Sequence, residues 1–439
     1  MNFNNARAKQ NIVILGAGFA GVRAALDLAR HLPSEVKITL IDRNSFHSYT
    51  PAFYEVAAAF LPEKKELSRK QFESLASTVV IPLRTIFKKY KQVKPVIGEV
   101  EEILPEKNQV KTKSGGEYYY DWLIIALGSE LDFFGLSEIK EYVYNLKNLE
   151  GALNLRNDID ELFYRRAKED NRANASLSLK REKIKIAVAG GGFLGSEIAA
   201  ELAGYVEKLN RQHSRPEENC EITVVEGGMN VLGNASEWAR KKAARRLEKL
   251  GVKILTNSLI SKVTKEKMVL KDGRDISYDI LIWTTGVRAC AIAGWLAGQK
   301  LKGKGCLAVD QYLRVIPYEN IFAAGDIAYA SDYEINAFLP MTAQVAILHG
   351  KYIAYTIKRI IRKRRPFPYW PHQNRFSIAL GGCYALFDGR RLKFSGFFAW
   401  LLKHLTTLKY FASILPFHRA FFIWRRGLKT FYKTTIDKQ

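Results

Sequence analysis

The sequence predicts an α/β protein with two Rossmann-like dinucleotide-binding domains and a C-terminal helical segment. Two segments repeat one order of strand, glycine-rich turn, helix, second strand and acidic residue. The length of 439 residues is enough for two or three domains with buried cores. Residues 351–439 differ from the rest, because they hold 19 Lys and Arg, only 2 Asp and Glu, and 20 of the 52 aromatic residues.

The first copy begins with strand NIVIL and ends with strand KITLID. Between them, Gly16, Gly18 and Gly21 form a GxGxxG turn. The first glycine allows the tight turn, the second lets the backbone approach a pyrophosphate, and the third lets helix and strand pack closely. Asp42 closes the second strand, where a carboxylate accepts hydrogen bonds from a ribose. Alternatively, the glycines of one copy serve only to pack helix against strand. This alternative is much weaker for two copies with the same order of elements.

The second copy has the same order, with Gly190, Gly192 and Gly195 in its turn. Its acidic residue, Glu226, comes 31 residues after Gly195 because residues 206–219 look like an insertion. An acid at this position favours a free 2′-hydroxyl and repels a 2′-phosphate. The second site is therefore expected to prefer NADH to NADPH.

Two dinucleotide sites in one chain indicate a flavoenzyme, in which one site holds FAD and the other brings a nicotinamide to it. The downstream segment NIFAAGD places FAD in the first site. Its Gly325 and Asp326 would put a carboxylate and a helix N-terminus near the ribityl and pyrophosphate groups. Alternatively, Asp326 serves as a simple helix N-cap.

Other classes of site find no support in the sequence. The four cysteines are scattered and form no CxxC pair, and the seven histidines do not cluster at ligand spacing, so no metal site is expected. The N-terminus lacks the pattern of a signal peptide. The C-terminal apolar runs are interrupted by Lys and Arg, so no segment is expected to span a bilayer.

The residues resemble the two-dinucleotide-fold disulfide reductase superfamily, and within it most closely the type II NADH:quinone oxidoreductases, which are single-subunit and do not pump protons. The likeness covers nearly the whole chain. It includes DRNSFHSYTPAFYEVA, DWLIIALGS, LKNLEGALNLRNDI, GGGFLGSE, VVEGGMNVL, IWTTGVRA, NIFAAGD and TAQVA. DRNSFH and LKNLEGALNLRNDI are fairly specific to this family, whereas GxGxxG and GD occur throughout the superfamily.

The resemblance implies three groups of site residues. FAD would be bound by Gly16, Gly18, Gly21, Asp42, Thr50, Pro51, Gly128, Gly325 and Asp326. The NADH site would be lined by Gly192, Gly195, Glu197, Glu226 and Gly286. Ala343-Gln344-Val345-Ala346 matches the first half of the quinone motif, in which Gln344 would meet the quinone close to the flavin. Glu197 would lie between nicotinamide and flavin, or it is simply an early-helix carboxylate.

The sequence departs from this family at two places. Where a second Gln is usual, the chain has Leu348, followed by His349. The quinone head group would then be held differently, or the acceptor is not an ordinary ubiquinone or menaquinone. His349 is either a proton donor to reduced quinone or, as we prefer, a histidine packed against its neighbours. The usual Ala-Thr-Gly turn is Ala126-Leu127-Gly128, which loses a hydroxyl near the flavin.

Four segments are expected along the chain. They are a first FAD-binding part at 1–147, an NADH-binding domain at 148–307, a second FAD-binding part with the quinone motif at 308–385, and an amphipathic membrane-binding segment at 386–439. Related dithiol reductases and sulfide:quinone oxidoreductases are disfavoured, because no cysteine precedes Cys220. A reductase with another acceptor, or a flavin-bearing redox-sensing scaffold with a basic binding tail, remains the alternative.

The tail is expected to be helical from about residue 390, with a break near Pro416. On a helix, Phe397, Trp400, Leu401, Leu405, Leu408 and Ala412 share one face, and Lys403, Thr406, Thr407 and Tyr410 lie mostly on the other. Apolar aromatics beside Lys and Arg suit an anionic membrane surface, and nucleic acid is not expected. Packing against the protein's own core is the alternative. We expect a peripheral protein on the cytoplasmic face of the cell membrane, and a homodimer.

Overall fold

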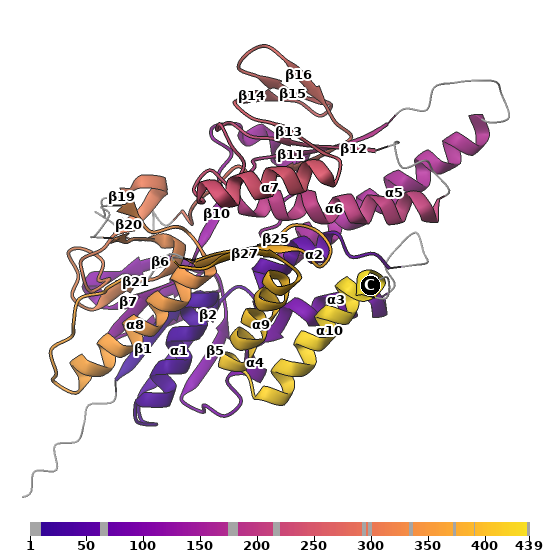
Figure 1. Ribbon diagram of the computed structural model, residues 1–439. Coiled ribbons are helices and arrows are strands. Elements are labelled where there is room, and N and C mark those ends of the chain that lie inside the picture. Colours follow the sequence, from indigo (N-terminus) through magenta and orange to yellow (C-terminus); the bar gives the residue numbers. More distant parts are fainter. Residues whose placement is uncertain are drawn as a thin grey trace, which may run out of the picture. The chain divides into compact units, whose positions relative to one another are not determined.

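The computed structural model describes residues 10–61, 69–173, 183–213, 220–291, 296, 301–332, 337–371, 375–389 and 391–436. The chain divides into two compact units. The first comprises Met1–Ser48, Val80–Leu131 and Val287–His372, and the second comprises Tyr49–Val79, Asp132–Gly286 and Gln373–Gln439. Each unit contains one parallel sheet with a glycine turn after its central strand (Figure 1). The predicted α/β class with two Rossmann-like folds is confirmed.

The first unit is built on a five-stranded parallel sheet in the order β21-β9-β1-β2-β5. Its central strand is fully buried from Ile12 to Leu15, which explains the unbroken apolar run of this segment. The strands are β1 (Asn11–Leu15), β2 (Lys37–Asp42), β5 (Val93–Ile97), β9 (Trp122–Ile125) and β21 (Ile321–Ala323). The carboxyl ends of these strands share one edge, where Rossmann folds bind their ligands.

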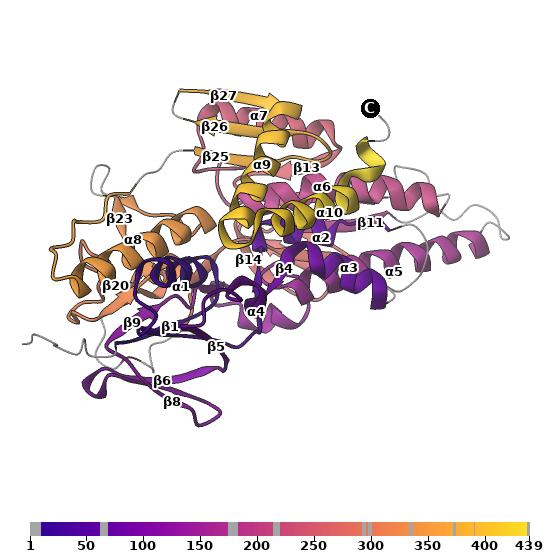
Figure 2. The ribbon, with the colours of Figure 1, turned by 90° about the horizontal axis from the view of Figure 1, so that it is seen from below.

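Two helices of this unit, α1 (Phe19–His31) and α8 (Ala343–Ile361), lie side by side in every view (Figures 1 and 2). Their backbones approach closely at Gly350. A Cβ there would clash with the Ala20 carbonyl oxygen and lie 3.1 Å from the Ala24 nitrogen. Glycine at this position therefore sets the spacing of the two helices.

The remaining elements of the first unit are short. They are β3 (Phe46–Ser48), β4 (Val80–Pro82), α4 (Leu83–Ile86), β6 (Val100–Leu104), β7 (Gln109–Thr112), β8 (Glu117–Tyr119), β10 (Ser129–Leu131), β18 (Val287–Ala289), β19 (Leu301–Lys302), β20 (Cys306–Ala308), β22 (Ala328–Tyr329), β23 (Ser331–Asp332) and β24 (Ala337–Phe338). Single-turn 3-10 helices occur at Pro105–Lys107, Gly303–Gly305 and Gly325–Ile327.

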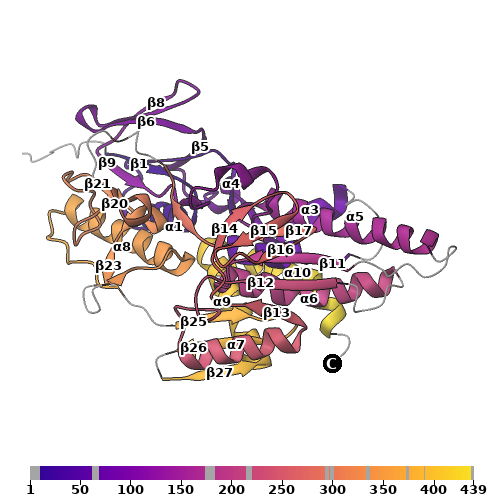
Figure 3. The ribbon, with the colours of Figure 1, turned by 90° about the horizontal axis from the view of Figure 1, so that it is seen from above.

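The second unit has a four-stranded parallel sheet in the order β13-β12-β11-β17. The strands are β11 (Ile184–Ala189), β12 (Cys220–Val225), β13 (Val252–Leu255) and β17 (Ile280–Trp283). Helix α6 (Phe193–Gln212) packs on β11, β12 and β13, and Figure 3 shows it running beside them. Because α6 follows the second glycine turn directly, its first residues lie at the carboxyl edge of this sheet.

Further elements of this unit surround the sheet. They are α2 (Phe53–Ala57), α3 (Arg69–Val79), α5 (Leu149–Ala173), α7 (Glu237–Lys249), β14 (Ile260–Val263), β15 (Lys267–Leu270), β16 (Asp275–Ser277), and 3-10 helices at Thr50–Ala52 and Ser137–Glu141. The strands β25 (Arg375–Ala379), β26 (Ala385–Gly389) and β27 (Lys393–Gly396) form an antiparallel sheet.

The C-terminal helices are α9 (Phe397–Ile414) and α10 (Phe417–Ile436), separated at Pro416 as predicted. Helix α9 contacts β25–β27, and α10 contacts α9 and α3 (Figure 2). The helical region begins later than the expected residue 390, because Lys393–Gly396 pairs with β26. No helix within the described ranges is long and apolar enough to cross a membrane.

Two residues that the sequence assigns to the polar face of α9 are buried. The side chain of Lys403 is only 14 % exposed, and Tyr410 is buried. The sequence does not predict this burial, because the partners lie in distant segments: Lys403 contacts acids of α2 and α6, and Tyr410 stacks on Tyr49.

Candidate functional site: two dinucleotide turns and a buried acid cluster

The first glycine turn combines close packing with an open helix N-terminus. A Cβ on Gly16 would clash with the Ala126 carbonyl oxygen, and one on Gly21 with the Gly16 carbonyl oxygen. By contrast, nothing lies within 4 Å of a Cβ placed on Gly18, which caps α1 without any side-chain hydrogen bond. The turn therefore leaves the N-terminus of α1 open to a phosphate, as a dinucleotide site requires.

Two side chains hold the backbone of this turn at Ala17. The Asp42 carboxylate accepts a hydrogen bond from Ala17 N at 2.6 Å and another from Asn44 N at 2.7 Å. His47 Nδ1 lies 2.9 Å from the Ala17 carbonyl oxygen, and its ring meets Phe19 edge-on. Burial lowers the pKa of His47 to about 4, so the ring is neutral and its Nδ1–H donates to this carbonyl.

His47 was not among the residues predicted from the sequence, although it lies within DRNSFH. The signal available was a histidine next to one apolar residue, Phe46, in β3, which by itself indicates only a buried histidine.

The other residues predicted for FAD in this unit lie at the same sheet edge. Gly128 follows β9 and Gly325 follows β21, both with positive φ, 74° in each case. Asp326 accepts a hydrogen bond from the Ser129 hydroxyl at 2.5 Å. Asp42 ends the neighbouring strand β2, so the structure brings Gly16, Gly128 and Asp326 to one edge with it.

The segment that was matched to the quinone motif forms the start of α8. Thr342 caps the helix by accepting a hydrogen bond from Val345 N, Ala343 is the first helical residue, and Gln344 is exposed. Gln344 and Leu348 stand one turn apart on the same face.

His349 is buried and points elsewhere. Its Nδ1 accepts a hydrogen bond from Gly325 N at 3.1 Å, and its ring contacts Tyr369 edge-on. Burial lowers the pKa of His349 to about 3, which makes it neutral across the physiological range. These contacts favour the packing role, in which His349 holds the Gly325–Asp326 turn, over the role of proton donor.

The second glycine turn repeats the geometry of the first. Gly190 has φ +100°, and a Cβ on Gly195 would clash with the Gly190 carbonyl oxygen. Nothing lies within 4 Å of a Cβ placed on Gly192, which caps α6, so this N-terminus is open as well. Glu226 binds the loop backbone, accepting hydrogen bonds from Gly191 N at 2.6 Å and Gly228 N at 2.7 Å.

Three predicted residues of this unit lie apart from the turn itself. Gly286 follows β17 and accepts a hydrogen bond from Asp132 N, and a Cβ there would meet the Phe134 ring at 3.0 Å. Thr50 and Pro51 begin the 3-10 helix that leads into α2. Their contact with FAD remains a prediction.

The second unit also contains a buried acid cluster, formed by Glu55 of α2, Glu197 and Glu201 of α6, and Lys403 of α9. The Lys403 ammonium lies 3.6 Å from Glu197 Oε1 and 3.9 Å from Glu55 Oε1. One ammonium group thus stands among three carboxyl groups. If all three carboxyl groups were ionised, the single ammonium would leave negative charge uncompensated, so only some of them can be ionised at once.

Tyrosines surround Glu55. Tyr54 and Tyr432 donate hydrogen bonds to its Oε1 at 3.0 and 2.9 Å, and Lys403 also contacts the Tyr54 hydroxyl. Burial raises the pKa of Glu55, against the lowering effects of Lys403 and of these hydrogen bonds. Burial also raises the pKa values of both tyrosines, so they remain donors.

The two acids of α6 hold protons near neutral pH. Burial raises the pKa of Glu197 to about 7 although Lys403 and the Ala379 N–H lower it. Burial, followed by the charge of Glu55, raises the pKa of Glu201 to about 8, and its buried Oε1 has no hydrogen-bond partner among the residues that the structure describes. Of these acids, only Glu197 was predicted from the sequence, because a carboxyl without a motif gives no local signal of burial.

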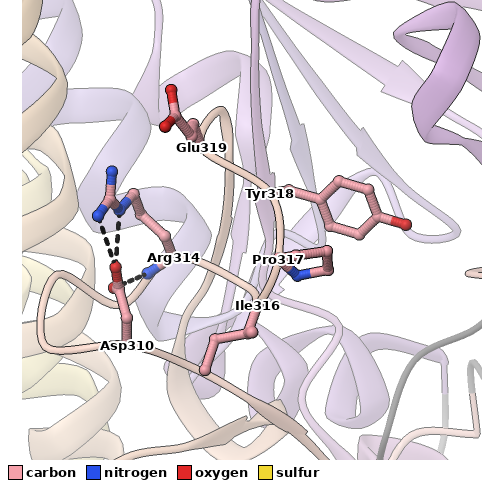
Figure 4. Close-up of a pocket in the computed structure, with 6 residues that line it drawn as sticks. All are labelled: Asp310, Arg314, Ile316, Pro317, Tyr318 and Glu319. Atoms are coloured by element: carbon pink, nitrogen blue, oxygen red, sulfur yellow. Dashed lines mark hydrogen bonds and ion pairs between the residues drawn. The ribbon is translucent and has the colours of Figure 1, made fainter.

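A separate cavity of about 210 Å³ lies in the first unit, lined by Asp310, Arg314, Ile316, Pro317, Tyr318 and Glu319 (Figure 4). Its Arg314 guanidinium is already paired, since Asp310 Oδ2 accepts from Nε at 2.8 Å. Asp310 Oδ1 also accepts from the backbone nitrogen of Arg314, so the pair stabilises the turn. None of the six lining residues is a predicted site residue.

No group of three or more His, Cys, Asp or Glu in the described part of the chain suits a metal ion.

The chain resembles known proteins along nearly its whole length. It is 27 % identical to the type II NADH:quinone oxidoreductase Ndh of Mycobacterium tuberculosis, over 96 % of this chain and 90 % of that protein. Its fold matches the structure of NDH2 from Plasmodium falciparum in complex with NADH, with a TM-score of 0.80 at 19 % identity, covering 97 % and 99 % of the two chains.

The fold is shared with other enzymes. The sulfide:quinone oxidoreductase of Aquifex aeolicus matches with a TM-score of 0.70 at 17 % identity, over 96 % of this chain and 92 % of that one. The family model for pyridine nucleotide-disulphide oxidoreductases matches residues 10–350, which include both glycine turns and the start of α8. This chain therefore belongs to the pyridine nucleotide-disulphide oxidoreductase family.

Proposed function

We propose that this protein is a FAD-dependent NADH:quinone oxidoreductase that does not pump protons. The observation that carries the proposal is the duplicated turn, in which Gly18 and Gly192 each leave a helix N-terminus open. Relatives named type II NADH:quinone oxidoreductase, similar over most of the chain, support the choice of substrates.

The first unit is the proposed FAD site. Gly16, Gly18 and Gly21 would receive the pyrophosphate at the N-terminus of α1, with Asp42 near the ribose and Gly128, Gly325 and Asp326 along the same edge. Thr50 and Pro51 are the further proposed contacts, near the ring. Bound FAD supplies hydride acceptance from a nicotinamide and electron delivery to a quinone.

The second unit is the proposed NADH site, formed by Gly192, Gly195, Glu226 and Gly286. Because Glu226 holds its carboxylate against the loop through two backbone N–H groups, a 2′-phosphate near it would meet a fixed negative charge. NADH is therefore the proposed donor and NADPH a poor one.

Quinone reduction consumes two protons, and solvent, His349 and Glu197 are the candidate sources. Glu197 and Glu201 retain protons near pH 7 or 8, whereas His349 is neutral and cannot donate from a charged form. Ala343 and Gln344 are the proposed quinone contacts. Leu348 one turn later favours an acceptor other than an ordinary ubiquinone or menaquinone as the second candidate.

The C-terminal helices are the proposed attachment to an anionic lipid surface, on the cytoplasmic face of the membrane, where NADH is present. Helices α9 and α10 expose large apolar side chains, and Phe398, Phe417 and Phe422 are 74 %, 66 % and 59 % exposed. Exposed Arg419 and Arg425 stand on the same helix as two of them. Exposed aromatics with adjacent cations are typical of interfacial helices.

The test uses full-length protein loaded with FAD. We expect NADH to bleach the flavin absorbance and a short-chain quinone to restore it, with NADPH at least about tenfold less effective. A panel of benzoquinones, naphthoquinones and soluble carriers then identifies the acceptor. Bleaching without reoxidation by any quinone would contradict the proposed acceptor, and an absence of bleaching would contradict the proposed enzyme. Size-exclusion chromatography tests the proposed homodimer.

A further inference from the structure

Residues 351–370, at the end of α8 and in the loop after it, form a basic and aromatic surface of the first unit that the proposed chemistry does not use. The segment reads KYIAYTIKRIIRKRRPFPYW and contains seven Lys and Arg and five aromatic residues. No acidic residue occurs in the sequence between Glu334 and Asp388. Its charge is therefore not balanced by acids of the same segment.

The cations and two rings of this surface face solvent. The four consecutive residues Arg362, Lys363, Arg364 and Arg365 are all exposed. Just beyond them, Phe367 is 60 % and Trp370 56 % exposed. Large exposed aromatic side chains beside a run of cations are uncommon on a surface that meets only water.

The loop is folded back on the helix. Arg359 Nε donates a hydrogen bond to the Arg365 carbonyl oxygen at 2.7 Å, and the Arg359 guanidinium lies 4.7 Å from the centre of the Phe367 ring. The Tyr352 hydroxyl donates to the Phe367 carbonyl oxygen at 2.6 Å. These contacts hold the run of cations and the exposed ring in a defined arrangement. In Figure 1 this loop continues the orange ribbon of α8.

A cavity of about 290 Å³ lies between α8 and this loop, lined by Leu348, Lys351, Tyr352, Tyr355, Tyr369 and Trp370. Its walls are mainly aromatic and aliphatic, with one ammonium group, from Lys351. An apolar cavity beside exposed cations suits an amphiphile, whose chain enters the cavity while its phosphate meets the cations.

We propose that residues 351–370 bind the anionic phospholipids of a bilayer, with Arg362–Arg365 and Lys351 at the headgroup phosphates and Phe367 and Trp370 at the acyl boundary. This surface belongs to the first unit, whereas the apolar side chains of α9 and α10 belong to the second. The lipid contact is therefore additional to the one proposed for the C-terminal helices, and it does not depend on the proposed enzyme activity. Stacking platforms for nucleic acid are displayed in open basic grooves, whereas here four rings line an apolar cavity with Leu348.

Vesicle flotation of the full-length, flavin-loaded protein tests this proposal. The charge variant is R362Q/K363Q/R364Q/R365Q, and the control variant is K88Q/K89Q/K91Q/K94Q, which removes four exposed cations elsewhere on the first unit. We expect the charge variant to bind phosphatidylcholine vesicles containing phosphatidylglycerol at least about 100-fold more weakly than wild type, and the control variant to lose less than about tenfold. Thermal unfolding confirms that both variants are folded.

The aromatic variant F367S/W370S provides a second, independent measurement. We expect it to lose about tenfold in affinity for the same vesicles while keeping the wild-type dependence on salt. Equal losses of vesicle affinity in R362Q/K363Q/R364Q/R365Q and K88Q/K89Q/K91Q/K94Q would mean that net charge alone determines binding. That result would overturn the proposal. Unchanged binding in both the R362Q/K363Q/R364Q/R365Q and F367S/W370S variants would also overturn it. A third result would also overturn it. In that case wild type binds single-stranded DNA at physiological salt but not phosphatidylglycerol vesicles, and R362Q/K363Q/R364Q/R365Q no longer binds the DNA.

Discussion

Tyr432, near the end of α10, donates a hydrogen bond to Glu55 of α2, which lies 377 positions earlier in the chain. Lys403 of α9 contacts the same carboxyl group, so both C-terminal helices contribute to the buried acid cluster. These helices therefore determine the charge state of a core that includes two acids of α6, as well as presenting apolar side chains to the outside.

Replacing Lys403 with Met should destabilise the protein by about 3–5 kcal/mol, because it leaves buried carboxyl groups without their ammonium partner. Without Lys403 the pKa of Glu197 rises above its present value of about 7. The loss of unfolding free energy should be larger at pH 8 than at pH 5, because more carboxyl groups must ionise at pH 8. Chemical denaturation at both pH values measures it, with Lys409→Met, an exposed lysine of the same helix, as control. Equal losses for the two variants would contradict the ion pair.

Replacing Glu201 with Gln should stabilise the protein at high pH. The Glu201 carboxyl keeps its proton in the folded state to about pH 8, but ionises near pH 4.5 when unfolded. The contribution of Glu201 to the free energy of unfolding is therefore complete below pH 4.5, and it is lost as the pH rises from 4.5 to about 8. Because Gln does not ionise, the variant should melt higher than wild type at pH 8 and nearly equally at pH 5.

The matched control for this experiment is Glu207→Gln, since Glu207 is exposed on the same helix α6 and pairs with Arg211. Its melting temperature should follow wild type at every pH. A Glu201→Gln curve that also runs parallel to wild type from pH 5 to 8 would mean that Glu201 ionises normally.

Alanine at two glycines of the first turn should separate folding from FAD binding. Gly21→Ala brings a methyl group against the Gly16 carbonyl oxygen, so α1 must move away from β1 and the melting temperature should fall. Gly18→Ala has free space and should melt like wild type, but its methyl group points where the pyrophosphate would approach. The ratio of FAD to protein absorbance after purification should fall in Gly18→Ala. Full FAD content in that variant would contradict the site.

Replacing Glu226 with Gln should reduce the preference for NADH. The variant loses the negative charge that opposes a 2′-phosphate, so the ratio of kcat/KM for NADH to that for NADPH should fall about tenfold. Stopped-flow bleaching of the flavin with each nucleotide measures this ratio directly. Glu221→Gln, in strand β12 that Glu226 directly follows, is the control and should leave the ratio unchanged.

The sequence predicted those parts of the site that depend on local geometry. The glycine turns were found because a strand, a tight turn and a helix leave a pattern within about 30 residues. Both turns show the expected combination of close packing at Gly16, Gly21 and Gly195 with open space at Gly18 and Gly192.

The acid cluster was missed because it depends on contacts between α2, α6, α9 and α10. Helical periodicity placed Lys403 on the face opposite the apolar residues, but it does not show what packs against that face. A buried lysine is stable only beside acids, and those that Lys403 contacts, Glu55 and Glu197, lie in distant parts of the sequence. The hydrogen bond of His349 in α8 likewise depends on a residue outside its own helix, since its partner Gly325 lies 24 positions earlier in the chain.

The close approach of α1 and α8 at Gly350 has a consequence for how this enzyme can diversify. The spacing of the two helices depends on backbone atoms and on a residue without a side chain. The side chains on the outward face of α8 therefore contribute little to holding the helix in place. Gln344 and Leu348 on that face are free to change without moving the first glycine turn at the start of α1. Under the proposed quinone contact, a new electron acceptor would then require only a few substitutions along one helix.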